Sequence, residues 1–298
     1  MKRILLAAGH GLVLVLPLVL SLALPPAAQA QPVPRVQQAQ PVPRVQQALS
    51  DDPRLVPAQG ALATGDFAQA IDSLKPLAAE GIVQAQFLLG LALERAPAPL
   101  AKPEEAHTWY LKAATAGLAA AQNNLGAMFF DGRGTVADPA LAAHWYRAAA
   151  EQNFVVAQYN LGLLHESGKG VPKDLKEMAI WIERAARGGL PVAQVRIGEM
   201  YYYGLGVSAS AFTAANWFQI AARQNHPVAQ YYLGLMLQKG VGLERNLTAS
   251  HGWLLRAAEA GNRNAMAELA LIYDVGLGVP SSDEEARRWR DLAAGEKK

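Results

Sequence analysis

The chain has 298 residues, of which 51% are hydrophobic and 17% are charged, and it contains no cysteine. The lack of cysteine excludes a disulfide scaffold, a thiolate metal site and a cysteine nucleophile. The formal net charge is +2, but Lys2 and Arg3 are the charged residues of the first 30, so the remaining chain carries 25 basic and 25 acidic residues. Nucleic-acid binding is not predicted, because phosphate neutralisation needs an excess of Lys and Arg.

The first 30 residues have the organisation of a secretory signal peptide. Two basic residues precede a nearly unbroken apolar run from Ile4 to Leu24, and Ala28-Gln29-Ala30 has the small-x-small pattern of a cleavage site. We predict cleavage after Ala30 and a periplasmic or secreted mature protein without stable membrane insertion. The alternative is an uncleaved anchor, since about 21 apolar residues can just span a bilayer.

Residues 31–50 are predicted to be a disordered Pro/Gln linker. The nine residues QPVPRVQQA at 31–39 recur without a change at 40–48. A segment rich in Pro and Gln that lacks aromatic residues buries too little apolar surface to order itself. We assign no binding site to this duplication.

A period of 36 residues governs the rest of the chain. Every tryptophan recurs at this spacing: Trp109, Trp145, Trp181, Trp217, Trp253 and Trp289. The same spacing separates a repeated alanine, the Leu-Gly or similar pair that follows it and a later Ala-Ala pair. Recurrence at a fixed period indicates a repeat architecture. We divide the chain into six units: 81–116, 117–152, 153–188, 189–224, 225–260 and 261–296.

Each unit is predicted to contain two helices. The first runs from two residues before the repeated alanine to ten residues after it, and a Gly-x-Gly loop follows in five units. The second helix begins at side chains that can cap it, namely Asp138, Asp174, Ser210, Asn246 and Ser282. It ends at residues that accept a left-handed backbone: Gly81, Gly117, Asn153, Gly189, Asn225 and Gly261.

The pattern A-x-x-x-L-G-x-x-Y-x-x-G-x-G-V-x-x-D-x-x-x-A-x-x-W-x-x-x-A-A-x-x-G is matched almost in full by residues 157–189. The sequence therefore resembles the Sel1-like repeat family, a relative of the tetratricopeptide repeats. The resemblance implies an all-α fold, a right-handed α-solenoid of six 36-residue helix-loop-helix repeats. Residues 51–80 are expected to add a degenerate N-terminal cap hairpin. Each tryptophan is expected to fill the wedge between successive units.

No catalytic, metal or cofactor site is predicted. After the leader the chain holds five histidines, none of which has helical ligand spacing to another with a Glu between them: His107, His144, His165, His226 and His251. No nucleophile motif such as G-x-S-x-G or S-x-x-K is present. We expect no enzyme activity.

Function is expected on the outward face of the first helices, which differs between units. By resemblance to the family, this face lines the concave groove of the solenoid. A rotation of 100° per residue assigns to it Asn124, Tyr159, Asn160, Arg196, Glu199, Tyr202, Tyr203, Tyr231 and Tyr232, with Asn123 and Phe130 beside them. Tyr, Arg and Asn supply contact area and hydrogen bonds at modest entropic cost. The alternative interpretation is that the tyrosines only pack along the groove wall.

We predict a non-catalytic scaffold or regulator of the bacterial cell envelope that binds a protein or an extended peptide in the groove. The resemblance allows an envelope sensor kinase or a component of polysaccharide or cell-wall assembly as the partner. The alternatives are a cell-wall-directed enzyme, such as a peptidoglycan or β-lactam hydrolase, and a purely structural envelope component.

The leader generates a direct prediction about the mature chain. N-terminal sequencing or intact-mass measurement of the secreted protein should give Gln31 as its first residue, because the small-x-small pattern ends at Ala30. A purified protein that is membrane-bound and retains Met1 would identify the segment as an anchor instead.

Overall fold

The computed structural model describes residues 52–295, and the predicted signal peptide and linker lie outside this range. The described chain is helical throughout. In order its elements are η3 (Pro53–Leu55), α1 (Val56–Thr64), α2 (Phe67–Ala79), α3 (Val83–Arg95), α4 (Pro103–Thr115), α5 (Ala119–Asp131), α6 (Pro139–Glu151), α7 (Val155–Ser167), α8 (Leu175–Arg187), α9 (Pro191–Tyr203), α10 (Ala211–Arg223), α11 (Pro227–Lys239), α12 (Leu247–Glu259), α13 (Arg263–Val275) and α14 (Asp283–Ala294).

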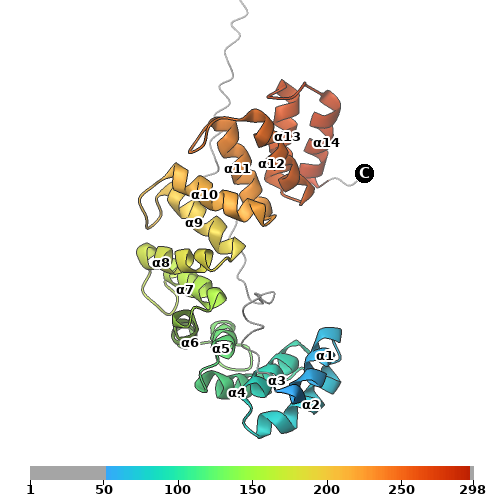
Figure 1. Ribbon diagram of the computed structural model, residues 1–298, viewed down its shortest axis with the longest axis vertical. Helices are drawn as coiled ribbons and strands as arrows, with labels where there is room; N and C mark the ends of the chain where they lie inside the picture. Colours follow the sequence, from blue (N-terminus) through green and yellow to red (C-terminus); the bar gives the residue numbers. More distant parts are fainter. Residues whose placement is uncertain (1–51, 296–298) are drawn as a thin grey trace, which may run out of the picture. The chain divides into compact units, whose positions relative to one another are not determined.

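Each helix packs against the next one along the chain, and the units stack as an α-solenoid (Figure 1). The odd-numbered helices from α3 to α13 are the first helices of the six units, and each pairs with the even-numbered helix after it. One apolar cluster already extends from Leu55 before α1 to Met128 in α5, so neighbouring hairpins share their core. A single repeat cannot bury its apolar face alone, and stacking supplies the missing cover.

The predicted helix ends are confirmed. Asp138 and Asp174 accept two backbone N–H groups each from the first turns of α6 and α8, and the three other predicted caps accept one each. The predicted termination residues all have positive φ, including 62° at both Asn153 and Asn225. Among the described residues, these two asparagines are the only non-glycine positions with a positive φ. The capping residues and the left-handed residues therefore set the length of the helices.

A glycine on the first helix lets the two helices of a unit approach closely. A Cβ atom built at Gly162 would lie 2.8 Å from the Ile182 side chain, and one at Gly198 would lie 2.8 Å from Phe218. The last unit has Ala270 instead, and the exposed Arg290 occupies the position that holds the large partner in the other units. The small residue and its large buried partner thus form one packing unit.

The tryptophans are less buried than predicted. Trp181 and Trp289 are buried, but the four others are half-buried. The residue after each of the first five tryptophans is the more deeply buried one, because it faces the glycine: Tyr110, Tyr146, Ile182, Phe218 and Leu254. The four half-buried tryptophans therefore fill the wedge between units only in part, although Trp109, Trp145 and Trp217 still pack against the apolar clusters.

A buried glutamine ties each unit to the one before it. The side chain of Gln158 donates from Nε2 to the carbonyl oxygen of Ala150, near the end of the preceding helix, at 3.1 Å. The same bond, eight residues back, recurs at Gln86, Gln122, Gln194 and Gln230. Each of these carbonyl oxygens also accepts the backbone N–H three residues further on, as Ala150 does from Asn153 at 3.0 Å, so the glutamine adds a second hydrogen bond at the helix end. The last unit has Met266 at this position and lacks the bond.

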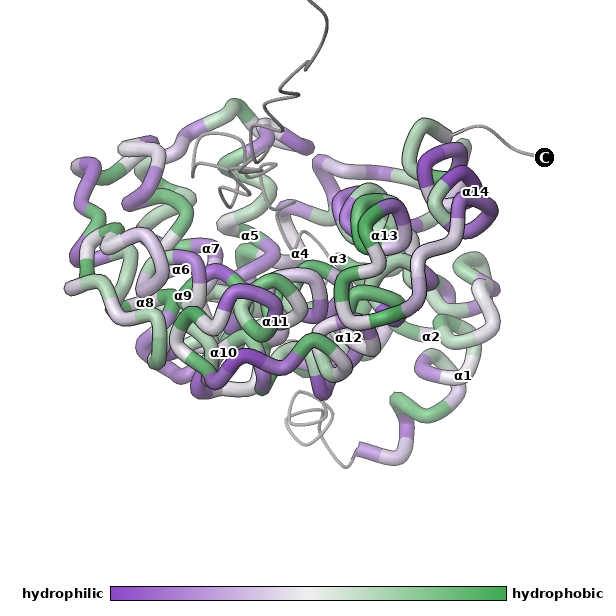
Figure 2. The backbone as a smooth tube through the Cα atoms, turned by 90° about the horizontal axis from the view of Figure 1, so that it is seen from above, coloured by the Kyte–Doolittle hydropathy of each residue, from purple (hydrophilic) through white to green (hydrophobic). Residues whose placement is uncertain are grey.

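The outer helix of the last unit is strongly polar. Figure 2 shows α14 mainly in the colour of hydrophilic residues, and its first turn contains Asp283, Glu284 and Glu285. Acidic side chains in a first turn complement the positive end of the helix dipole. The solvent side of α14 therefore presents charge rather than an apolar stripe.

The second glycine of each Gly-x-Gly loop generates a stability prediction. A Cβ atom at Gly170 would lie 2.0 Å from the carbonyl oxygen of Pro139 in the preceding hairpin, and φ there is +75°. Gly170→Ala should therefore lower the free energy of unfolding by at least about 2 kcal/mol, through strain and the forced separation of two units. Thermal or urea unfolding measures the change.

The matched control is Gly252→Ala in the interior of α12, where a Cβ atom would meet nothing within 4 Å. This change should leave stability unaltered or raise it by about 0.5–1 kcal/mol, because alanine is the better helix former. Equal losses for the two variants would contradict the proposed close contact.

Candidate functional site

Polar side chains form a continuous band across the first helices of successive units. We call this band the polar seam and define it as Glu94, Asn123, Asn124, Arg133, Tyr159, Asn160, Glu166, Arg196, Glu199, Tyr203 and Tyr232. Its members lie on α3, α5, α7, α9 and α11 and, for Arg133, in the loop after α5. The scaffold residues recur in at least five of the six units, whereas the positions of the seam carry different residues in most units.

The N-terminal part of the seam joins α3 to α5. The hydroxyl of Tyr110, a residue of α4, donates to Glu94 at 2.8 Å, and Asn124 donates to the same hydroxyl oxygen at 3.2 Å. Arg133 forms an ion pair with Glu94 across the two units. The polar side chains in this part of the seam therefore find their hydrogen-bond and ion-pair partners in one another and in Tyr110.

A pair of asparagines carries the seam from α5 to α7. Asn160 donates from Nδ2 to Oδ1 of Asn123 at 3.1 Å, and Asn123 donates to Asn124 at 3.2 Å. Asn123 and Asn160 are 4% exposed, so both amides are removed from bulk water. The side-chain amides therefore bridge neighbouring first helices.

The centre of the seam is an ion-pair cluster between α7 and α9. Arg196 pairs with Glu166 on α7 and, through Nη1 at 2.9 Å, with Glu199 one turn further along α9. The Glu199 side chain is 4% exposed, that of Arg196 is 14% exposed and that of Glu166 is 36% exposed. One guanidinium is thus shared by a buried carboxylate and an accessible one.

The cluster continues to the aromatic residues of α11. The Tyr232 hydroxyl hydrogen-bonds with Glu199 and with the Tyr203 hydroxyl, and its ring stacks on Phe218 at 4.7 Å. The rings of Tyr202 and Tyr203 meet edge to face at 5.0 Å. Five successive first helices are therefore linked through the side chains of the polar seam and its immediate neighbours.

Burial controls the protonation of these groups. It raises the pKa of Glu199 above its ordinary value, and this effect exceeds the opposing attraction of Arg196. Burial also raises the pKa of Tyr231 to about 12 and raises the pKa values of Tyr159 and Tyr232. The tyrosine hydroxyls are therefore neutral hydrogen-bonding groups at physiological pH.

The predicted outward orientation is wrong for several of the nine candidate residues. Those that are buried are Tyr159, Asn160, Glu199, Tyr231 and Tyr232, as is the neighbouring Asn123. Those that are half-buried are Asn124, Arg196, Tyr202 and Tyr203. The assignment considered only the partner helix of each hairpin, but side chains of the adjacent first helices cover these positions from both sides.

The structure also adds residues that the sequence analysis missed. Glu94, Tyr110, Arg133 and Glu166 take part in the network described above, and Gln238 donates to the buried Glu268 at 3.0 Å. Aligning the six units by their repeated alanine would have singled out Glu268, since the first unit carries Leu88 at the equivalent position, but the position of Glu94 and Glu166 holds no leucine in any unit. The role of Tyr110 carried no such signal, because it lies on a second helix.

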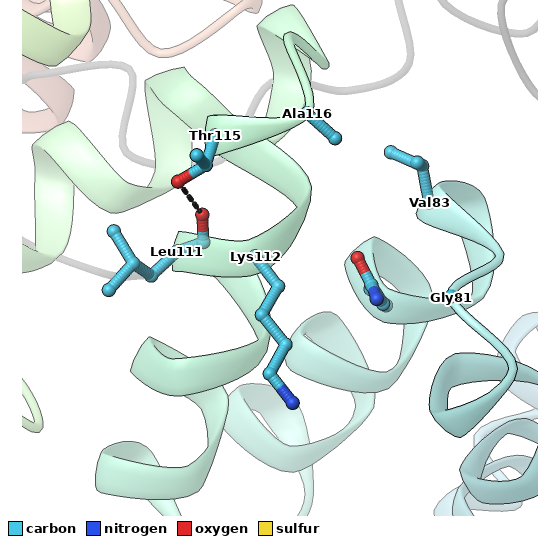
Figure 3. Close-up of a pocket in the computed structure, with 7 residues that line it drawn as sticks. Gly81, Val83, Leu111, Lys112, Thr115 and Ala116 are labelled. Atoms are coloured by element: carbon cyan, nitrogen blue, oxygen red, sulfur yellow. Dashed lines mark hydrogen bonds between the residues drawn. The ribbon is translucent and has the colours of Figure 1, made fainter.

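Other features of the described residues do not form a comparable site. A surface hollow near the start of α3 and the end of α4 is lined mainly by aliphatic groups, and Thr115 there donates to the Leu111 carbonyl at 2.7 Å (Figure 3). No group of three metal-binding side chains occurs among residues 52–295. In the same range no helix combines the length and the apolar character needed to cross a membrane.

Comparison with protein families identifies the class of repeat. The Sel1 repeat model matches six consecutive segments, at 83–118, 119–154, 155–190, 191–226, 227–262 and 263–294. These segments account for most of the chain, which therefore belongs to the Sel1 repeat family. The matched segments begin at the first helix of each unit, two residues after the boundaries chosen from the left-handed residues.

Solved structures give the same result. The chain is 32% identical to a Sel1 repeat protein from Oxalobacter formigenes, with a TM-score of 0.69 over 80% of this chain and 96% of that one. It is 29% identical to c5321, a protective antigen of uropathogenic Escherichia coli with an SLR fold, with a TM-score of 0.77 over 85% of this chain. The match spans 55% of the length of that antigen. No curated protein matches the chain significantly.

The ion-pair cluster generates a pH-dependent stability prediction. Arg196→Ala should lower the free energy of unfolding by about 3 kcal/mol near neutral pH, because it leaves Glu199 buried and uncompensated. Without Arg196 the pKa of Glu199 rises further, so the folded state binds a proton more tightly than the unfolded state. Part of the lost stability should therefore return as the pH falls from neutral toward the ordinary carboxylate pKa.

The control is Arg187→Ala, which removes an ion pair with Glu183 at the surface of α8. That variant should change stability by less than about 1 kcal/mol and show no recovery at acidic pH. Urea unfolding at several pH values compares the two. A pH-independent loss in Arg196→Ala would mean that Glu199 is solvated rather than buried.

Proposed function

We propose that this Sel1 repeat protein is a non-catalytic scaffold or regulator of the cell envelope that binds a protein or extended peptide along the polar seam. One observation carries the proposal: the helix-packing residues recur in at least five of the six units, whereas the seam positions hold polar and aromatic side chains that differ between most units. A repeat scaffold needs only its recurring residues to fold. The residues that differ between units are therefore free to serve recognition.

The composition of the seam supports a macromolecular partner. Half-buried Tyr202 and Tyr203 offer aromatic area, and Arg196 and Asn124 offer hydrogen-bonding groups that remain partly accessible. Tyr and Arg are enriched among residues that dominate binding energy at protein interfaces. The groups spread over several helices, which suits an extended segment better than a compact metabolite.

The contacts of the histidines favour a scaffold over a hydrolase. His107 packs edge to face on Phe129, His251 bonds the Tyr273 hydroxyl at 3.0 Å, and His165 lies 3.3 Å from the Pro172 carbonyl oxygen. Each of these contacts ties one structural element to another. A peptidoglycan or β-lactam hydrolase would need such a side chain within reach of a nucleophile.

We infer that the protein acts in the periplasm or outside the cell, and the signal-peptide pattern of residues 1–30 supports this proposal. A partner in that compartment would be the outer part of a sensor kinase or a component of polysaccharide or cell-wall assembly. A purely structural envelope component is the competing proposal, and it requires no specific partner at the seam.

Site-specific photocrosslinking tests the proposal. A benzophenone amino acid at Tyr202 should capture a defined partner in cells that produce the protein, because this side chain is half-exposed beside the seam. The matched control carries the same group at Phe212, which is 65% exposed on the second helix α10. Mass spectrometry identifies the captured protein.

Capture from position 202 but not from position 212 is the expected result. Replacing Asn124 with Ala in the Tyr202 crosslinking variant should weaken capture, since the lost contact lies on the same seam. Equal capture from both positions, or capture from neither, would contradict a binding role for this face.

A further inference from the structure

Glu199 stands at a position where the fold calls for an apolar residue. The five other units carry Leu91, Ala127, Leu163, Leu235 and Leu271 there. Transferring a carboxylate into a site where its side chain is 4% exposed has a desolvation cost that an ion pair recovers only in part. The helix packing of the repeat therefore does not explain why this position is charged.

Arg196, the partner of Glu199, is equally dispensable for packing. The first unit carries Leu88 and Leu91 at the two corresponding positions. Leu88 is buried in the core of that unit, so the scaffold accepts an apolar pair where the fourth unit has an ion pair. Replacing a buried ion pair by apolar residues is often neutral or stabilising.

A tyrosine hydroxyl in the same cluster has no bonding partner. Tyr159 is fully buried, and its Oη atom and Nε of Arg196 lack hydrogen-bond partners within the described structure. The charges that act on this hydroxyl are those of Arg196, Glu166 and Glu199, so it lies among them. The first unit has Phe87 at this position, which shows that the ring alone satisfies the fold.

The cluster has one negative charge in excess. Arg196 balances one of the two carboxylates, and Glu166 is the accessible member, with 36% of its side chain exposed. Glu166 and Tyr202 hold equivalent positions in consecutive units, so the accessible carboxylate lies on the first helix next to the one that carries the half-buried Tyr202 and Tyr203 rings. An exposed carboxylate beside aromatic rings suits a cationic group, since ring faces attract cations.

We propose that Glu166, Arg196, Glu199 and Tyr159, with the rings of Tyr202 and Tyr203, form the docking site for a Lys or Arg side chain on an extended protein segment. The inference rests on the proposed function and specifies the chemistry of the partner. The incoming cation pairs with Glu166, and Arg196 remains with Glu199. Arg196 then donates from Nε to the Tyr159 hydroxyl oxygen, so that both orphan atoms gain a partner.

Peptide pools test the charge preference. Three fluorescein-labelled pools share the same neutral randomised flanks and differ at one central residue, which is Arg, Gln or Glu. Fluorescence anisotropy with the full mature protein should show at least about tenfold tighter binding of the Arg pool than of the Glu pool at low salt, with a smaller difference at high salt. Absence of that preference overturns the inference.

Variants locate the preference at the cluster. Glu166→Gln should reduce the preference for the Arg pool at least about fivefold, since it removes the accessible charge. Glu151→Gln, at an exposed position at the end of α6, should leave the preference unchanged. Equal effects of the two variants overturn the assignment to Glu166.

The double variant Arg196→Leu/Glu199→Leu reproduces the leucine pair of the first unit. It should unfold at the same temperature as the parent protein or higher, yet lose the preference for the Arg pool, because Glu166 is no longer held in place. A well-folded double variant with the full preference overturns the role of the buried pair. If the double variant does not fold, the fold requires the ion pair, and this result overturns the inference.

The proposed function and this inference fail in different ways. Crosslinking of a partner from position 202 together with equal binding of the three pools leaves the scaffold role standing and removes the cationic docking site. Absence of crosslinking and of binding by any pool removes both.

Discussion

The structure depends on one steric constraint, the contact between a glycine on the first helix and a large side chain on the second. At Gly162 and Gly198 the opposing side chain would lie 2.8 Å from a Cβ atom, which is closer than ordinary contact allows. This contact fixes the distance between the two helices of a unit, and the Gly-x-Gly loop and the buried glutamine then fix the distance between units. Interactions of short range, each repeated in five of the six units, build the whole solenoid.

Because these contacts use only recurring residues, the residues at the remaining positions can vary without disturbing the fold. The polar seam shows the result. It includes an amide bridge between Asn123 and Asn160 and an ion-pair cluster around Arg196, and it joins five first helices without repeating any motif. The unit-specific residues of a regular scaffold are thus the place where a binding specificity can evolve without loss of the fold.

The sequence predicted the helices almost residue by residue, and the reason is local chemistry. Capping side chains such as Asp174 and left-handed residues such as Asn153 act within one turn of their own position, so their effect can be read from a single segment. The orientation of Tyr159 and Tyr232 could not be derived in this way. Their burial depends on side chains from neighbouring units, such as Glu199 beside Tyr232, which a helical projection of one segment omits.

The substitution of methionine for glutamine at position 266 has a consequence for the dynamics of the molecule. The junction between α12 and α13 lacks the side-chain bond to a helix end that ties the earlier units together, and the last unit carries the exposed Arg290 at the position that holds a large buried residue in the other units. In a linear array, local opening starts at the weakest interface and propagates from it. The backbone amides of α13 and α14 should therefore exchange with solvent before those of the central units, and unfolding should advance from this junction toward the middle of the solenoid.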